Sequence, residues 1–107
     1  MIKNRRSFIC GIKGLNLSKA EVIFLKKYKP WGVILFSRNI KSIKQTQTLT
    51  SKIKKIFNDR NYPILIDEEG GRVSRLRNFI DNSTFPQKYF GNLYTKDVKK
   101  FKSYYYV

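Results

Sequence analysis

The chain has 107 residues, about the length of one small domain, and its 41% content of hydrophobic residues is too high for a disordered protein. Its formal net charge of +16, with no histidine, would attract polyanions such as nucleic acid or an anionic membrane surface. The lysines are scattered, however, so solvated surface explains the charge more simply, and no segment approaches the roughly 20 apolar residues of a membrane helix.

The first predicted element is an apolar strand over residues 7–12, preceded by a basic segment. The single cysteine, Cys10, cannot form an internal disulfide, and its apolar neighbours predict a buried, unreactive thiol. The apolar run is interrupted by Lys13 and is too short for a signal peptide, so we expect a cytoplasmic protein.

A helix is predicted over residues 18–28. Ser18 and Glu21 have the spacing of a capping box, in which each side chain binds the other residue's backbone N–H. Pro30 ends this helix, because a residue before proline avoids the helical conformation. A second apolar strand follows over residues 32–36, and Arg38 and Asn39 just beyond it are candidates for the rim of a pocket.

A second helix is predicted from Ser42, with Gln45 as its capping-box partner. Apolar residues recur on one face of this helix, and lysines occupy the opposite face. The apolar residues are Leu49, Ile53, Ile56 and Phe57, and the lysines are Lys44, Lys52 and Lys55.

The stretch over residues 63–76 carries the clearest functional signal. Ile64, Leu65 and Ile66 form an apolar run, which predicts a strand buried on both sides. Three of the chain's seven acidic residues follow directly: Asp67, Glu68 and Glu69. One of the two glutamates is expected to brace Arg38 or Arg72. Gly70 and Gly71 come next and are predicted to adopt positive φ angles.

The predicted order is strand, helix, strand, helix, strand, which is typical of right-handed crossovers and a parallel sheet in an α/β protein. In such folds, sites lie beyond the carboxyl ends of the strands, where Asp67 is placed. Signals weaken after Arg77. Residues 79–80 and 85–86 are predicted to be loop residues that pack on an apolar surface, and Asp97 could cap a further helix over 98–103.

These segments resemble the N-terminal part of glycoside hydrolase family 3, specifically its bacterial β-N-acetylhexosaminidases of cell-wall recycling. The resemblance covers most of residues 7–92, and its main segments are residues 30–39, Gln45, Leu49-Thr50, residues 64–75 and Phe85-Pro86. This chain has Glu68 where the family usually has glutamine, which adds a negative charge.

The resemblance implies an α/β fold whose parallel sheet forms the first three β/α units of a (β/α)₈ TIM barrel. Residues 1–92 would be this N-terminal part, and residues 93–107 an incomplete third helix with an aberrant end that truncates the barrel. It also implies a retaining glycosidase that releases terminal N-acetylglucosamine from peptidoglycan-derived saccharides, with no cofactor or metal. The family's nucleophile and acid/base would lie beyond residue 107, so the chain alone is expected to be inactive.

By the same resemblance, Asp67 would bind ring hydroxyls of the sugar, and Arg75 would contact it from the following loop. A carboxylate suits this role because it is a strong acceptor for sugar hydroxyls. The alternatives are structural: Asp67 could form an ion pair with Arg72 or Arg75, and Arg75 could simply brace the loop.

Two other functions remain open from the sequence. A small basic nucleic-acid-binding protein would use the many basic and aromatic residues, although the aromatics fall mostly in predicted strands and helix faces. Asp67 and Glu69 could also act together as an acid–base pair, since they lie on the same side of an extended chain, about 6.5–7 Å apart. We expect nucleic acid to bind only non-specifically, through net charge, and we expect no membrane partner.

Overall fold

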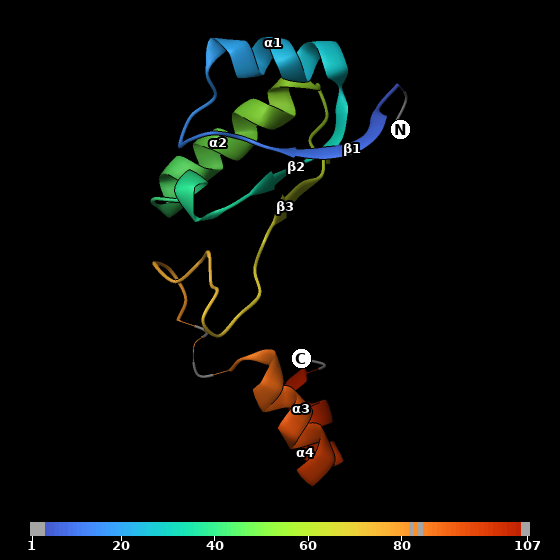
Figure 1. The fold of residues 1–107 in the computed structure, drawn as a ribbon, viewed down its shortest axis with the longest axis vertical. Coiled ribbons are helices and arrows are strands. Elements are labelled where there is room, and N and C mark those ends of the chain that lie inside the picture. The colour runs from blue at the N-terminus through green and yellow to red at the C-terminus, as the bar shows by residue number, and fades with distance from the viewer. Residues whose placement is uncertain (1–3, 82, 84, 106–107) are drawn as a thin grey trace. The chain divides into compact units, whose positions relative to one another are not determined.

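The computed structural model describes residues 4–81, 83 and 85–105 (Figure 1). These divide into two compact units that meet at the bond between Asp67 and Glu68, and each unit is described by itself.

The first unit alternates strands and helices along a parallel sheet. Its elements are β1 (Arg6–Gly11), α1 (Lys19–Tyr28), β2 (Pro30–Leu35), the short 3₁₀ helix η1 (Ser37–Asn39), α2 (Ile43–Ile56) and β3 (Ile64–Ile66). The sheet order is β1-β2-β3, and β2 pairs in parallel with both neighbours, with Val33 opposite Cys10 and Ile64. The predicted α/β fold with a parallel sheet is therefore confirmed.

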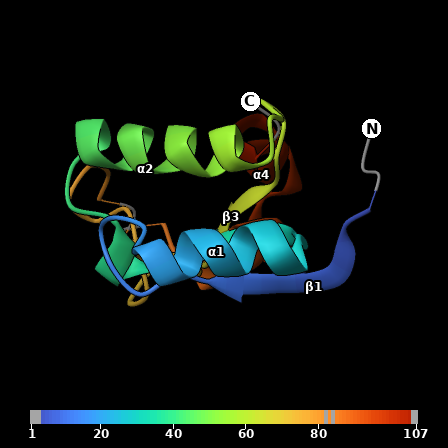
Figure 2. The same cartoon turned by 90° about the horizontal axis from the view of Figure 1, so that it is seen from above.

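The core of this unit lies between the sheet and its two helices. The two crossovers run in the same direction along the sheet and place α1 and α2 on one face of it, where they lie side by side (Figure 2). The fully buried aliphatic side chains come from β2 and both helices: Val33, Leu25, Leu49 and Ile53. The predicted lysine face of α2 is exposed, as expected.

Local side-chain bonds start both helices where the sequence indicates. Ser18 and Glu21 form the predicted capping box, with Oγ and carboxylate contacts of 3.1 and 2.8 Å to the partner's backbone nitrogen. At α2 only half of the predicted box forms. Ser42 Oγ accepts from the Gln45 N–H, but Gln45 Oε1 accepts from Lys41, one residue before the predicted donor.

Two burial predictions are wrong. β3 is half-buried rather than covered on both sides, and Ile66 is 36% exposed, because among the described residues β3 pairs only with β2. Cys10 is also only half-buried, since β1 is the opposite outer strand of the described sheet. Even so, burial first and the Glu21 charge second raise the pKa of the Cys10 thiol, which keeps it protonated and unreactive at neutral pH.

The second unit begins with a loop and ends in two helices that contact each other, α3 (Gln87–Lys96) and α4 (Val98–Tyr105). Asp97 caps α4 as predicted, because its Oδ1 accepts from the Lys100 N–H at 3.0 Å. Helix α3 was not predicted, since Pro86 at its N-cap offers no side-chain bond and its first turn has no acidic residue. The proposed domain boundary at residues 92–93 falls within α3 and stays a prediction.

The apolar loop residues of this unit are more exposed than predicted. Ile80 is 54% and Phe85 51% exposed, so neither is packed into an apolar surface. Phe85 instead makes an edge contact with the Tyr89 ring of α3, with centroids 5.3 Å apart.

Candidate functional site

Asp67 lies at the carboxyl end of β3, as predicted. Its N–H donates to the carbonyl of Leu35 at 3.1 Å, which continues the pairing of β3 with β2 one residue beyond the strand. The Asp67 side chain is half-buried. A carboxylate is thus fixed by its backbone at the edge of the sheet where parallel α/β folds carry their sites.

Asn39 organises the same carboxyl edge in a way that the sequence did not reveal. Its side chain is fully buried, and its Oδ1 accepts from the Phe36 N–H at 2.9 Å. Its Nδ2 donates to the carbonyls of Ile12 and Gly14 at 3.1 and 2.8 Å. Asn39 therefore joins the segments that follow β1 and β2, and the prediction that it lines a pocket rim is wrong.

Arg38 and Gln45 reinforce this junction. The Nε of Arg38 donates to the Ile12 carbonyl at 3.0 Å, and its guanidinium lies over the Phe36 ring, 4.7 Å from the centroid. The Nε2 of Gln45 donates to the carbonyl of Leu15 at 2.8 Å. The side chain of Arg38 remains exposed at this edge, so its place on a pocket rim stays a prediction.

Within the second unit, Glu68 shapes the loop that carries Arg75. Its carboxylate accepts from the backbone N–H groups of Gly70, Arg75 and Leu76, at 3.2, 2.7 and 3.2 Å. Desolvation raises the pKa of Glu68, but these hydrogen bonds outweigh it and hold the pKa below its ordinary value. Glu68 thus binds loop backbone, and the prediction that one of Glu68 and Glu69 braces Arg38 or Arg72 stays a prediction for Glu69.

The two glycines give this loop its bend. Gly70 and Gly71 have φ angles of 73° and 58°, as predicted. A Cβ on Gly71 would lie 2.9 Å from the Cβ of Pro86, so the second glycine is required by space as well as by conformation. The loop also receives a hydrogen bond from Arg77 to the Gly71 carbonyl at 3.2 Å.

Arg75, the second predicted site residue, is half-buried in this loop. Its backbone N–H makes the shortest of the three hydrogen bonds to the Glu68 carboxylate. Asp67 ends the first unit, and Arg75 belongs to the second. The structure therefore fixes the backbone of each residue by a specific bond inside its own unit.

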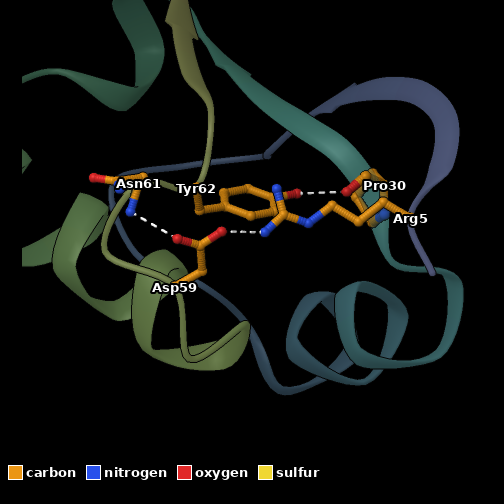
Figure 3. A network of polar contacts seen from close by, with 5 residues as sticks. All are labelled: Arg5, Pro30, Asp59, Asn61 and Tyr62. Atoms are coloured by element: carbon orange, nitrogen blue, oxygen red, sulfur yellow. Dashed lines mark hydrogen bonds and ion pairs between the residues drawn. The ribbon is translucent and has the colours of Figure 1, made fainter. Parts of the chain in front are cut away.

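A polar network at the amino ends of the strands was also missed. Arg5, just before β1, forms an ion pair with Asp59, and its guanidinium lies 4.6 Å from the centroid of the Tyr62 ring (Figure 3). The buried Tyr62 hydroxyl donates to the Pro30 carbonyl at 2.9 Å, and burial raises its pKa to about 12. The Tyr62 ring stacks on Phe57, with centroids 3.9 Å apart.

Over the described residues, no group of His, Cys, Asp and Glu is arranged to hold a metal ion. Within the same ranges, no helix is long and apolar enough to cross a membrane. The carboxyl edge of the sheet instead carries polar side chains, among them Asn39 and Asp67, at positions that backbone hydrogen bonds hold in place.

No protein-family model matches the chain. It is similar to curated proteins named β-hexosaminidase: it is 45% identical over 69 residues to that of Alkalilimnicola ehrlichii, covering 63% of this chain and 19% of the relative. It is 36% identical over 89 residues to that of Xanthomonas campestris pv. campestris, covering 83% and 26%. The chain thus spans about a fifth to a quarter of the length of these relatives.

Solved structures agree with the sequence comparison. NagZ from Neisseria gonorrhoeae in complex with N-trifluoroacetyl-D-glucosamine is 32% identical, with a TM-score of 0.75, over 92% of this chain and 29% of NagZ. A fungal multi-domain GH3 β-N-acetylglucosaminidase matches with a TM-score of 0.58 and 32% identity, over 66% of this chain and 9% of the fungal protein. The resemblance noted in the sequence is therefore confirmed.

Proposed function

We propose that this chain, which resembles the β-hexosaminidases of glycoside hydrolase family 3 over most of its length, is the sugar-binding N-terminal part of such an enzyme. In this proposal β1, β2 and β3 are the first strands of a (β/α)₈ barrel. The ligand is a saccharide with a terminal N-acetylglucosamine, derived from peptidoglycan, and the protein works in the cytoplasm.

The observation that carries the proposal is the position of Asp67. Its backbone is held by Leu35 at the carboxyl edge of β3, and the segments beyond β1 and β2 are joined at the same edge by Asn39. A carboxylate at this point can accept two hydroxyl hydrogen bonds from a sugar ring. Arg75 would donate to sugar oxygens from a loop that Glu68 has already ordered.

We further propose that the chain binds sugar without hydrolysing it. Retaining hydrolysis needs two carboxyl groups about 5–5.5 Å apart across the scissile bond, one of them as nucleophile. Most acidic side chains of this chain are already committed to nearby backbone N–H groups; these are Glu21, Asp59, Glu68, Asp81 and Asp97. These hydrogen bonds leave few carboxylates of the chain available to act as a nucleophile or as an acid/base.

The Asp67 assignment is tested in a complete relative, where substrate turnover can be measured. In the Neisseria gonorrhoeae NagZ, changing the aspartate that aligns with Asp67 to alanine should lower kcat/KM for a chromogenic N-acetylglucosaminide about 30- to 700-fold. This corresponds to about 2–4 kcal/mol for a lost charge-assisted contact and unpaired partners. The matched control changes the residue aligned with Glu69 to glutamine, and should leave kcat/KM within about threefold. An unchanged kcat/KM in the aspartate variant would remove Asp67 from the site.

The second half of the proposal is tested on the purified chain. It should release no chromophore from the same substrate above the buffer rate, because retaining hydrolysis needs two available carboxyl groups and most of those in this chain are bound to backbone N–H groups. Steady turnover that persists after repeated purification would show that the chain carries a nucleophile of its own.

A further inference from the structure

A groove runs between the two helices of the first unit. Its volume is about 530 Å³. It is lined from the α1 side by Leu17, Val22 and Lys26, and from α2 by Lys52, Lys55 and Ile56. The two helices that form its walls contact each other and lie side by side in Figure 2.

The groove combines an apolar floor with a positive rim. Leu17, Val22 and Ile56 are half-buried, whereas the three lysines are exposed. No acidic residue lines it, and the nearest carboxylate in sequence, Glu21, is bound to the N–H groups of Lys13 and Ser18. The rim charge is therefore not neutralised by its own lining.

These lysines bring like charges close together on the rim of the groove. Lys52 and Lys55 are three residues apart on α2, which makes them neighbours on its surface, and Lys26 faces the same groove from α1. Like charges at this spacing weakly destabilise a helix. A partner that brings carboxylates to the rim would relieve the repulsion.

We propose that this groove binds an acidic amphipathic helix of a partner protein. Such a helix would place an aliphatic stripe on Leu17, Val22 and Ile56 and its flanking carboxylates on the lysines. The floor is aliphatic and offers no ring on which a nucleic-acid base could stack. It is also recessed between two helices, where a planar membrane surface would reach the lysines but not the floor.

The test uses the full chain and a fluorescein-labelled helical peptide with leucine at i, i+3, i+4 and i+7 and glutamate at the flanking positions. Fluorescence anisotropy should show saturable binding that weakens with added salt. A scrambled peptide of the same composition should bind at least about tenfold more weakly, because its leucines no longer form one stripe. Equal binding of the two peptides would overturn the proposal.

Variants locate the site. Lys52→Glu/Lys55→Glu should weaken peptide binding at least about tenfold through lost attraction and new repulsion. The control, Lys19→Glu/Lys41→Glu, makes the same change in net charge at exposed lysines outside the groove and should change affinity less than about threefold. Val22→Thr keeps the shape of the floor while adding a hydroxyl, and should weaken binding with unchanged far-UV circular dichroism.

Competing ligands complete the test. A single-stranded RNA oligonucleotide and phosphatidylserine vesicles should each respond alike to the groove and control variants, as expected of attraction to net charge alone. If the peptide also responds alike to both variants, or if RNA or vesicles depend specifically on Lys52 and Lys55, the acidic helix is not the partner of this groove.

Discussion

Asn39→Ala should destabilise the first unit by about 3–4 kcal/mol. The residue is fully buried, and its amide makes bonds to Phe36, Ile12 and Gly14. The Ile12 carbonyl would keep the Arg38 Nε as a donor, so the loss falls on the Phe36 N–H and the Gly14 carbonyl. Each buried group that loses its partner costs about 1–3 kcal/mol, so the two groups together set an upper limit of about 6 kcal/mol. A water that enters the small space left behind could bind these groups and reduce the loss below that limit.

The measurement is urea unfolding followed by far-UV circular dichroism, at one protein concentration for all variants. The matched control is Asn61→Ala, because Asn61 is exposed and uses its backbone N–H for the bond to Asp59. This control should change the free energy of unfolding by less than about 0.5 kcal/mol. A similarly small effect of Asn39→Ala would show that the amide does not join the carboxyl ends of β1 and β2 in solution.

Gly71→Ala should destabilise the second unit by about 1–3 kcal/mol, since φ is positive there and the new Cβ would meet Pro86 at 2.9 Å. Gly91→Ala, inside α3 with nothing within 4 Å, should instead stabilise it by about 0.5–1 kcal/mol, and melts in which both substitutions act in the same direction would contradict this reasoning. The Arg5 guanidinium holds the pKa of Asp59 below its ordinary 3.8, so its contribution to stability is present above pH 3.8 and lost as the pH falls through the lower folded-state value. Asp59→Asn should therefore lower the melting temperature at pH 7 and flatten its decline below pH 4, and an unchanged decline would mean that other carboxylates dominate acid unfolding.

The sequence predicted the parts of the fold that local rules determine. The Ser18 cap, the apolar face of α2 and the positive φ angles of Gly70 and Gly71 each depend on residues within a few positions of one another. The alternation of strands and helices then limited the topology to a parallel sheet, because chain connections are short and right-handed. Asp67 followed from the topology, since it comes directly after the last strand.

The interactions that the sequence did not predict join residues far apart in the chain, and hydrophobic periodicity gives no information about such pairs. Asn39 binds carbonyls 25 and 27 positions earlier, and Arg5 pairs with Asp59 across 54 positions. The role of Glu68 was missed for a different reason: a carboxylate near arginines suggests an ion pair, whereas the loop with Gly70 and Gly71 presents three backbone N–H groups to it. Burial of β3 was overestimated because an apolar run does not specify how many neighbours a strand has.

In the first unit, several stabilising contacts lie at the amino ends of the strands, whereas the candidate binding group lies at their carboxyl ends. The stabilising contacts lie where β1, β2 and β3 begin. There the Arg5 guanidinium lies over the Tyr62 ring, and the Tyr62 hydroxyl donates to the Pro30 carbonyl. Asn39 and Asp67 lie where the strands end, and there the fixed element is the backbone. In α/β barrels the carboxyl-end loops vary with the chemistry while the amino ends hold the scaffold. A substitution at Asp67 should therefore leave undisturbed the ring stack of Phe57 and Tyr62 and the ion pair of Arg5 and Asp59, which lie where the strands begin.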